Sequence, residues 1–447
     1  MMNWNQLIST QRLGASAQTD TDRYNRTQFQ RDYDRLIFSS AFRRMQNKTQ
    51  VFPLPGSIFV HNRLTHSLEV ACVGRTLGSL LGQYLVEQGE NNTLLHELGA
   101  VVSAGCLAHD MGNPPFGHAG EEAISDFFTN GNGKALLGKL KPEQQTDFTR
   151  FDGNANAFRL LSHQFEGRRA GGLALTYTTL ASIVKYPYES RYANKPKFGF
   201  SQSEKQTYLQ IASALGIPQK TNNPNQFVRH PLVFLVEAAD DICYQVMDIE
   251  DAYKLNILSY DTTAELLLNF LSGKQNSSTL QRIKDNFNIV TDPNERIAYL
   301  RASVINKLTN ECLSAFTHNL EAIMAGDFNT SLIKLASEDS QNAMGKVQEI
   351  SLKKIYNHRT VVEIEIAGYK ILGTLLDVFT HAVFAQKPQS KLTKMQLSMI
   401  PEQYLSPQQN DYEKLQSIVD FISGMTDVYA LDLYRKIQGI NLPGIGI

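Results

Sequence analysis

The sequence has few cysteines, a single tryptophan and almost no net charge. Its four cysteines, Cys72, Cys106, Cys243 and Cys312, are far apart among the 447 residues and show no CxxC spacing. This pattern argues against a zinc or redox motif built on CxxC and indicates small buried side chains in a reducing compartment. The formal net charge of −1 argues against nucleic-acid binding over the whole surface, although a local basic patch stays open.

Long hydrophobic runs are also absent. No apolar stretch approaches the roughly 20 residues of a membrane span, and the start, Met-Met-Asn-Trp-Asn-Gln, lacks the basic region and apolar core of a signal peptide. Hydrophobic residues make up 42% and charged residues 19%, which is typical of a globular chain. We therefore expect a soluble cytoplasmic protein with no membrane partner, built as two or three domain-sized cores or one large helical body.

Apolar residues recur at helical spacing along most of the chain, so the predicted fold class is mainly α. Strand signals are few and predict at most short β hairpins near 51–60 and 195–200. Residues 186–229 are rich in Lys, Asn, Gln, Pro and Tyr and predict a partly irregular excursion with an amphipathic insert near 203–214. The predicted helices are 31–49, 65–88, 94–108, 119–129, 154–165, 171–184, 231–256, 260–272, 293–325, 340–357, 359–385 and 409–438.

One stretch, residues 104–121, combines a helical run with an adjacent histidine and aspartate. The run reaches His109 and Asp110, is broken by a glycine and two prolines, and restarts as a helix at Ala119. Consecutive helical side chains point in different directions, but at a helix end both can face one metal ion, which imidazole and carboxylate suit. Taken alone, the pair is more typical of a buried helix end with a hydrogen-bonded histidine.

Two further residues add to this pair. His66 lies in the first turn of a predicted amphipathic helix, and Asp240 lies inside an apolar helical run, where an aspartate is costly to bury unless it is paired or bound to metal. Singly, His66 is explained as a helix-start residue, and Asp240 or Asp241 as a salt-bridge partner. Together, two imidazoles and two carboxylates predict a mixed nitrogen and oxygen metal site with room for water.

The order His66, His109-Asp110, Asp240 resembles the H…HD…D signature of the HD-domain metal-dependent phosphohydrolases. Longer segments resemble the bacterial dGTPase-like deoxynucleoside triphosphate triphosphohydrolases, and the resemblance extends from about residue 30 to 438. These segments are FRRMQNKTQVFP (42–53), NRLTHSLE (62–69), HDMGNPPFGH (109–118), FDGNA (151–155), KYP (185–187), EAADDICY (237–244) and SGMTD (423–427).

The resemblance implies an HD-domain helical core with a helical C-terminal extension. We assign 1–30 to a polar N-terminal arm, 31–256 to the HD-type metal-dependent catalytic core, and 257–447 to a helical scaffold that completes the pocket and the oligomer interfaces. Residues 386–408, with three prolines, predict a linker-like break in this scaffold. No internal repeat is evident.

The implied activity is hydrolysis of a dNTP, dGTP first among them, to a deoxynucleoside and inorganic tripolyphosphate, by attack of water at the α-phosphate. The implied metal ligands are His66, His109, Asp110 and Asp240. The expected ion is Mn²⁺ or Mg²⁺, with Fe, Co, Ni or Zn as alternatives. It would polarise the α-phosphate and activate a water molecule.

Cationic groups must converge on three phosphates, and Arg63 and Lys185 are the candidates, with Asn154 as a weaker one. Each cation also has an ordinary explanation as a solvated surface charge. His118 and Glu121 are three residues apart and neighbours on one helical face. We assign His118 to the α-phosphate or the departing 5′-oxygen, as acid, base or phosphate stabiliser, and Glu121 as its partner. A favourable interaction with the helix dipole is an alternative explanation for Glu121.

By resemblance, Tyr244 and Asp248 line the sugar pocket, where Asp248 accepts the 3′-hydroxyl and Tyr244 excludes a 2′-hydroxyl, although Tyr244 is equally well explained as a core aromatic. Gln50 and Val51 would contact the sugar and the base edge. Base selection does not follow from the sequence. Two glutamates in an ordinary helical pattern, Glu363 and Glu365, could accept hydrogen bonds from the N1/N2 edge of guanine. Positions on the exposed face of a surface helix explain these two residues better.

Two other functions stay open from the sequence. One is a different HD phosphohydrolase acting on phosphomonoesters or cyclic nucleotides, and the other is a nucleotide- or single-stranded-DNA-responsive regulator without turnover. The resemblance suggests a homo-hexamer or homo-tetramer tuned by a dNTP or single-stranded DNA effector. The long predicted helices 293–325 and 359–385 could form subunit interfaces.

Overall fold

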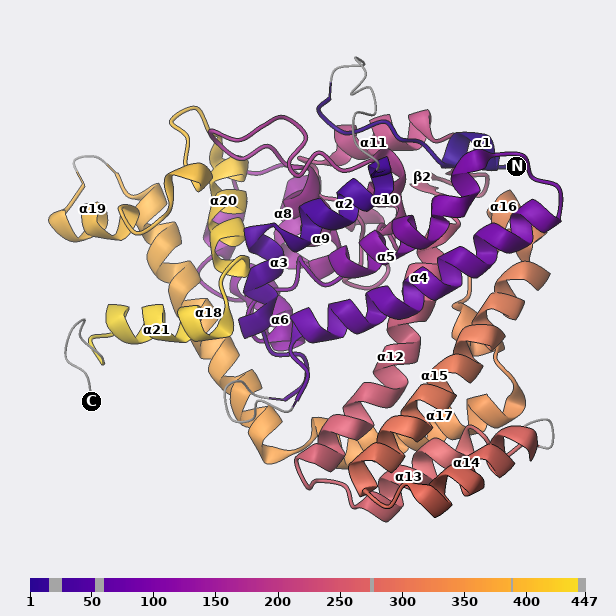
Figure 1. The fold of residues 1–447 in the computed structure, drawn as a ribbon. Coiled ribbons are helices and arrows are strands. Elements are labelled where there is room, and N and C mark those ends of the chain that lie inside the picture. The colour runs from indigo at the N-terminus through magenta and orange to yellow at the C-terminus, as the bar shows by residue number, and fades with distance from the viewer. Residues whose placement is uncertain (16–25, 53–59, 274–276, 387–388, 441–447) are drawn as a thin grey trace.

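The computed structural model describes residues 1–15, 26–52, 60–273, 277–386 and 389–440. Three helices that pack against one another form its frame (Figure 1). They are α4 (Arg63–Glu87), α5 (Leu98–Ala108) and α12 (Leu232–Lys254). α4 begins where the Asn62 side chain accepts the N–H of Thr65 and the Thr65 hydroxyl accepts the N–H of Asn62, a reciprocal cap.

Glycines on α4 allow α5 to approach closely. A Cβ added at Gly78 would collide with the carbonyl of Leu98, and one at Gly82 would collide with the carbonyl of Leu95. The close contact between these helices therefore depends on the missing side chains. It brings the C-terminal end of α5, where His109 follows, beside the N-terminal end of α4, where His66 lies.

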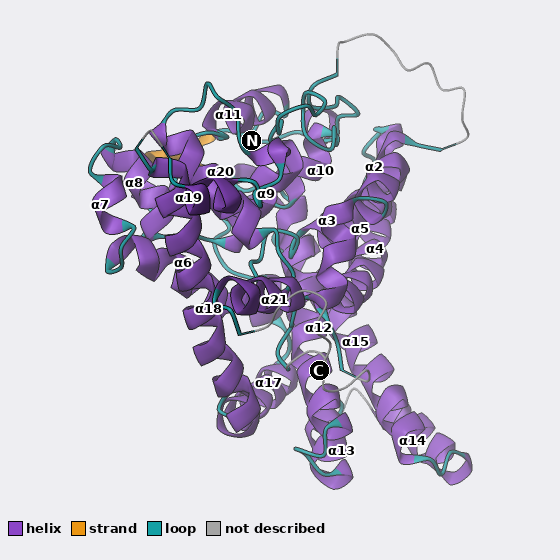
Figure 2. Ribbon diagram, turned by 90° about the vertical axis from the view of Figure 1, so that its left-hand side faces the viewer, coloured by secondary structure: helices purple, strands orange, loops and turns teal. Residues whose placement is uncertain are grey.

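The remaining helices pack around the frame formed by α4, α5 and α12. In Figure 2, α13 and α14 project from the lower end of the molecule, while α18 leads from that end to α6. The longer ones before residue 220 are α2 (Gln28–Ile37), α6 (Gly117–Thr129), α8 (Pro142–Thr149), α9 (Gly153–Ser162) and α11 (Lys205–Ala214). Those after α12 are α13 (Tyr260–Asn269), α14 (Ser277–Ile289), α15 (Pro293–His318), α17 (Glu338–Ile350), α18 (Arg359–Phe384), α20 (Asp411–Ser423) and α21 (Asp427–Ile437).

Short elements fill the gaps between these helices. A π-helical turn, η6 (Ser351–Tyr356), joins α17 to the segment before α18. The other short helices are α1 (Trp4–Leu7), α3 (Ser40–Arg44), η1 (Met45–Asn47), η2 (Thr93–Glu97), α7 (Lys134–Leu137), α10 (Tyr177–Ser182), η3 (Ser190–Tyr192), α16 (Leu320–Ala325), η5 (Leu332–Leu335), α19 (Lys391–Leu397) and η7 (Glu402–Tyr404).

The prediction of a mainly α fold is confirmed. Among the described residues the sheet content is one antiparallel pair, β1 (Gln219–Lys220) with β2 (Asn223–Phe227). The prediction of a hairpin near 195–200 is wrong. Phe200 makes only an isolated bridge with Glu189, and residues 195–200 form no strand. Most of the hairpin expected near 51–60 lies outside the described residues.

Two apolar clusters hold the helices together. The larger gathers side chains of α4, α5, α12, α13 and α15, and the second joins α6 and α8 to α18, α20 and α21. Both clusters include residues from before and after residue 256, so the C-terminal region is packed into the same body as the catalytic region. The division into functional regions at that residue stays a prediction.

The start of the chain is a core element, which corrects the polar arm expected over 1–30. Trp4 and Leu7 are buried in the larger cluster, and Arg12 pairs with the buried Asp32 at 2.5 Å. Apolar side chains separated by a short helical turn can anchor a segment whose average composition is polar. Residues 16–25 of the expected arm lie outside the described residues.

Other expectations differ from the structure in detail. The helices predicted over 31–49, 293–325 and 409–438 are each divided into shorter helices. The helix expected over 171–184 is reduced to α10, because Gly171, Gly172 and Ala174 have positive φ and form turns. The linker-like break at 386–408 contains α19. Cys72 is exposed on α4, whereas the other three cysteines are buried as expected. None of the described helices combines the length and the apolar character needed to cross a lipid bilayer.

Candidate active site

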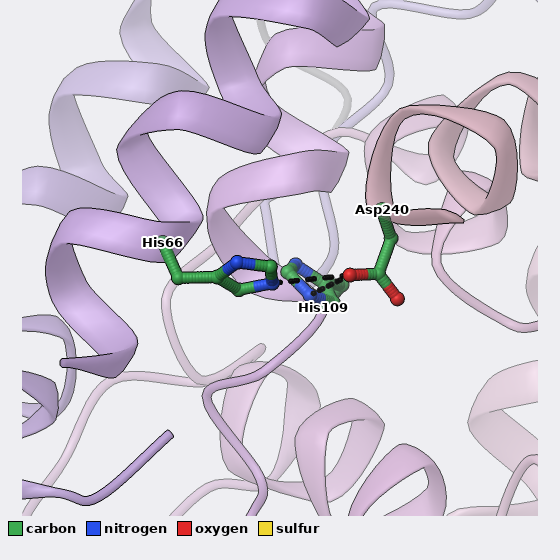
Figure 3. A group of neighbouring side chains, drawn as sticks. All are labelled: His66, His109 and Asp240. Carbon is green, nitrogen blue, oxygen red and sulfur yellow. Dashed lines mark hydrogen bonds and ion pairs between the residues drawn. The ribbon is translucent and has the colours of Figure 1, made fainter. Parts of the chain in front are cut away.

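Three of the four predicted metal ligands come together. His66 on α4, His109 at the end of α5 and Asp240 on α12 place their ligand atoms within 4.8 Å of one another (Figure 3). Asp240 Oδ1 lies 3.1 Å from His66 Nε2 and 3.5 Å from His109 Nε2. These nitrogen and oxygen donors suit a divalent ion such as Mn²⁺, Fe²⁺ or Zn²⁺.

The hydrogen bonds of His109 fit a metal ligand. Its Nδ1 lies 2.6 Å from the carbonyl oxygen of Cys106, so in the neutral ring the proton resides on Nδ1 and the lone pair on Nε2. That Nε2 is buried and has no hydrogen-bond partner among the described residues. A buried ring nitrogen without a partner, directed at a carboxylate and a second imidazole, is the arrangement that a bound cation completes.

The electrostatics of the cluster favour positive charge. Desolvation lowers the pKa of His109, but the carboxylates of Asp110 and Asp240 outweigh it and raise this pKa to about 9. Desolvation likewise raises the pKa of Asp240, but the two imidazoles outweigh it and hold the pKa well below the usual range. A divalent ion would replace the proton that this negative field attracts to His109.

Asp110 lies beside the three-residue cluster. Its Oδ2 accepts from Arg63 Nη1 at 2.7 Å and its Oδ1 accepts from Asn113 Nδ2 at 2.5 Å. Oδ1 also lies 3.7 Å from His109 Nε2, so the adjacent pair converges at the helix end as the sequence indicated. Its assignment as the fourth ligand stays a prediction.

His118 and Glu121 form the predicted pair on the first turn of α6. His118 Nδ1 lies 3.0 Å from Glu121 Oε2, and Glu121 Oε1 accepts from the backbone N–H of Gly153 at 2.7 Å. The hydrogen bond to Glu121 raises the pKa of His118. Burial raises the pKa of Glu121, but His118 and Lys197 outweigh it and lower this pKa. The His118 side chain is 82% exposed, so a fixed carboxylate orients an accessible imidazole.

Two residues of the cluster, His109 and Asp240, and both residues of the pair line one cavity of about 550 Å³, a size typical of small-molecule sites. His66 and Asp248 are not among the residues that line it. Most of the residues predicted to touch substrate line it. Those predicted for the metal and the proton are His109, Asp110, Asp240, His118 and Glu121; those predicted for phosphate, sugar and base are Arg63, Asn154, Lys185, Gln50, Val51 and Tyr244.

Both predicted phosphate cations line the cavity, but each has an acidic partner. Arg63 is 4% exposed and donates to Asp110, while its Nε is buried without a hydrogen-bond partner among the described residues. Lys185 Nζ lies 2.9 Å from Glu237 Oε1. Burial lowers the pKa of Lys185, but Glu237 outweighs it and raises this pKa, so the lysine is cationic at the cavity wall.

Lys197 is a third cation at the cavity that the sequence analysis missed. Its Nζ lies 3.3 Å from Glu121 Oε2 and 3.2 Å from Asp152 Oδ1. Residue 197 lies in the segment predicted as irregular, where no periodic pattern indicates which side chains point inward. A buried carboxylate such as that of Glu121 needs a partner. A search of the sequence for a cation to pair with Glu121 could therefore have pointed to Lys197.

Tyr244 and Asp248 meet a third residue, Tyr356, that the sequence analysis also missed. The Tyr356 hydroxyl donates to Asp248 Oδ2 at 2.7 Å and contacts the Tyr244 hydroxyl, and the two rings stack with centroids 6.4 Å apart. Burial raises the pKa of Asp248 to about 6. Tyr244 is 43% exposed at the cavity, so its explanation as a core aromatic is wrong. Asp248 lies behind the two rings.

The two glutamates considered for base recognition differ. Glu363 is exposed and pairs with Arg359 at 2.7 Å, which confirms its explanation as a surface helix residue. Glu365 is also exposed, yet it lines the cavity together with Val361 and Ile364 of the same helix.

The Glu121 contact predicts a measurable change in the titration of His118. In Glu121→Gln the charged acceptor is lost, so we expect the pKa of His118 to fall. NMR titration of the imidazole resonances, with His118 assigned from its loss in His118→Ala, measures this change. Glu122→Gln is the matched control, because Glu122 accepts instead from the hydroxyl of Tyr369. An unchanged His118 pKa in Glu121→Gln would contradict the pair.

Comparisons with known proteins agree with this site. The HD domain model matches residues 63–186, and the phosphohydrolase-associated domain model matches residues 335–436. The chain is 38% identical over 456 aligned residues to the deoxyguanosinetriphosphate triphosphohydrolase-like protein of Synechocystis sp., covering 99% of this chain and 100% of the relative. It is likewise 38% identical over 455 residues to a protein of the same description in Pseudomonas aeruginosa, with 99% and 100% covered.

A more distant relative carries the shorter name. The deoxyguanosinetriphosphate triphosphohydrolase of Yersinia enterocolitica is 30% identical over 519 aligned residues, covering 98% of this chain and 99% of the relative. The matches span the frame helices, the cavity and the C-terminal helices together. The chain belongs to the deoxyguanosinetriphosphate triphosphohydrolase-like family of HD-domain enzymes.

Proposed function

We propose that this protein hydrolyses deoxynucleoside triphosphates, dGTP first among them, to the deoxynucleoside and inorganic tripolyphosphate. The observation that carries the proposal is one cavity lined by both the His118–Glu121 pair and by His109 and Asp240, which His66 joins in a cluster of possible metal ligands. The names of the relatives from Synechocystis sp. and Yersinia enterocolitica support a triphosphate substrate with a guanine base.

His66, His109 and Asp240 would hold a divalent ion, and Asp110 is the proposed fourth ligand. Such an ion supplies a Lewis acid at the α-phosphate and makes a bound water more acidic. Mn²⁺ or Mg²⁺ is the proposed ion, and the two imidazoles also suit Fe, Co, Ni or Zn. The pairing of Asp110 with Arg63 links the metal ligands directly to a phosphate-binding cation.

His118 donates a proton to the leaving 5′-oxygen. Water attacks the α-phosphorus, the bond from phosphorus to the 5′-oxygen breaks, and that oxygen must gain a proton to leave as the deoxynucleoside alcohol. The hydrogen bond that His118 Nδ1 donates to the Glu121 carboxylate raises the pKa of His118 and favours its protonated form, which is the form able to donate that proton. Glu121, buried and tied to the backbone of Gly153, fixes the imidazole orientation.

The triphosphate chain is bound by Arg63, Lys185 and Lys197, with Asn154 as a neutral donor. These groups lie around the same cavity as the metal ligands. Charge-assisted hydrogen bonds to phosphate oxygens are stronger than neutral ones. Binding of the phosphates would then compete with the present acidic partners of Lys185 and Lys197.

The sugar is placed against Tyr244, which lines the cavity together with Gln50 and Val51, and next to Asp248, which is buried behind the rings of Tyr244 and Tyr356. Asp248 accepts the 3′-hydroxyl, and the ring of Tyr244 fills the space beside the 2′ carbon. The Tyr356 hydroxyl already donates to Asp248 Oδ2, so it holds the carboxylate in place for this contact.

The protein is further proposed to act as a homo-oligomer, a tetramer or hexamer, with a dNTP or single-stranded DNA as effector. The support for an oligomer is the resemblance to the family together with apolar side chains left exposed on α18, among them Val362 at 36% and Ile366 at 67%. Isolated exposed apolar residues are ordinary, but two on one turn of a long helix suit a subunit interface.

A product assay tests the function. With Mn²⁺ or Mg²⁺ and each dNTP singly and in mixture, we expect dGTP to give deoxyguanosine and tripolyphosphate in equal amounts, measured by liquid chromatography and ³¹P NMR. His109→Ala should be inactive, while His96→Ala, an exposed histidine on η2, should keep full activity. Release of pyrophosphate with dGMP, or of orthophosphate, would overturn the proposed reaction.

The sugar wall predicts a change in selectivity. Tyr244→Ala removes the ring beside the 2′ carbon, so kcat/KM for GTP should rise about tenfold or more relative to that for dGTP, within the range that one pocket contact contributes. Tyr244→Phe is the control, since it keeps the ring and should keep the rejection of GTP. Equal rejection of GTP by Tyr244→Ala would show that ribose exclusion lies elsewhere.

A further inference from the structure

Asp427, the first residue of α21, contacts both loops that flank the cavity. Its carboxylate is 5% exposed. Oδ2 accepts from the backbone N–H of Thr49 at 2.9 Å, and Oδ1 accepts from the backbone N–H of Phe116 at 3.1 Å. Thr49 directly precedes Gln50, and Phe116 lies two residues before His118, so one side chain joins two walls of the cavity.

A buried lysine makes a second link between the same segments. Lys48 is 3% exposed, and its Nζ donates to the carbonyl oxygens of Asn113 at 2.5 Å and Ser423 at 2.8 Å. Asn113 belongs to the loop that follows His109 and Asp110, and Ser423 ends α20. Neither Lys48 nor Asp427 is among the residues that line the cavity, so both act through the backbone that they hold.

The turn that Asp427 holds is strained. Phe116 has a φ of 64° in the left-handed region, which is unfavourable for a residue with a side chain. Gly117 follows with a φ of 59° and begins α6. Phe116, the residue before α6, does not cap the helix with its side chain. Asp427 instead accepts a hydrogen bond from the Phe116 amide and places a negative charge near the N-terminus of α6.

The position of the catalytic pair depends on this turn. His118 is largely exposed, and its hydrogen-bond partner Glu121 lies on the same helix, so the contact between them fixes the ring relative to α6 and not relative to the segment that contains Thr49 and Gln50. That segment is held by the contact between Thr49 and Asp427. A misplacement of about 1 Å in such a site can cost about 100-fold in rate.

We propose that Asp427, supported by Lys48, is a positioning residue that sets the distance between the His118 side and the Gln50 side of the active site. This role rests on the proposed function for its kinetic consequences. Its structural part, the clamping of the two loops by one carboxylate, does not depend on which substrate is hydrolysed.

The substitution Asp427→Asn tests the clamp with little change in volume. An amide presents one acceptor oxygen, while its NH₂ group would face the second backbone N–H, so one of the two contacts is lost. We expect kcat for dGTP to fall about 10- to 100-fold with Mn²⁺ affinity unchanged. Asp432→Asn is the matched control, because Asp432 lies on the same helix, exposed and paired with Lys436 at 2.6 Å; its kcat should stay within about twofold of the unaltered protein.

A double-mutant cycle separates positioning from stability. In a His118→Ala background, Asp427→Asn should change kcat less than about twofold, because the effect acts through His118. A full additional loss in that background would overturn the proposal. So would a lowered melting temperature with an unchanged kcat for Asp427→Asn, since that is the result of a purely structural role.

Hydrogen–deuterium exchange provides a readout that needs no turnover. Asp427→Asn should speed exchange in the peptides that contain Thr49 and Phe116, and Asp432→Asn should not. If the unaltered protein hydrolysed no dNTP, the proposed function would fail while this exchange result would still decide the clamp. Lys48→Met provides the same comparison if Asp427→Asn does not fold, with faster exchange expected around Asn113; unchanged exchange in the folded variant would overturn the clamp.

Discussion

The convergence of His66 and His109 on the carboxylate of Asp240 is the constraint on which the rest of the structure depends. The three residues lie on or at the end of three different helices. One ion can contact all three only if the packing of α4, α5 and α12 fixes the positions of these helices relative to one another. The glycines of α4 permit the necessary approach of α5. The Cys106 carbonyl then fixes the ring of His109 so that Nε2 faces the cluster.

Around this centre, the chain places each chemical task on a different segment. The start of α6 carries His118 and Glu121, the segment before α12 supplies Lys185 and Lys197, and α12 carries both Asp240, the proposed metal ligand, and Tyr244, the proposed sugar contact. The C-terminal helices pack on α6 through the second apolar cluster, and Asp427 extends that packing to the rims of the cavity. The C-terminal region is therefore part of the site architecture and not an appended unit.

Local sequence patterns indicated part of the site, and the resemblance to the HD-domain family decided between their ordinary and their functional explanations. A histidine beside an aspartate at a helix end, an aspartate in an apolar run, and a histidine three residues from a glutamate each have a physical signature, and the structure brings these residues to one cavity. Tyr356 and Lys197 have no such signature, since one lies in a π-helical turn 108 residues after its partner Asp248 and the other in an irregular segment. The burial of Trp4 was missed because residues 1–30 are polar on average, and this average hides the few apolar residues of a short helix.

Crystals grown with Mn²⁺ and measured at the manganese absorption edge test the central claim most directly. The account predicts an anomalous peak within bonding distance of His66 Nε2, His109 Nε2 and an oxygen of Asp240, and the loss of that peak in His109→Ala. A peak at another place, no peak in the unaltered protein, or a peak that survives His109→Ala would contradict the assignment of this cluster as the metal centre.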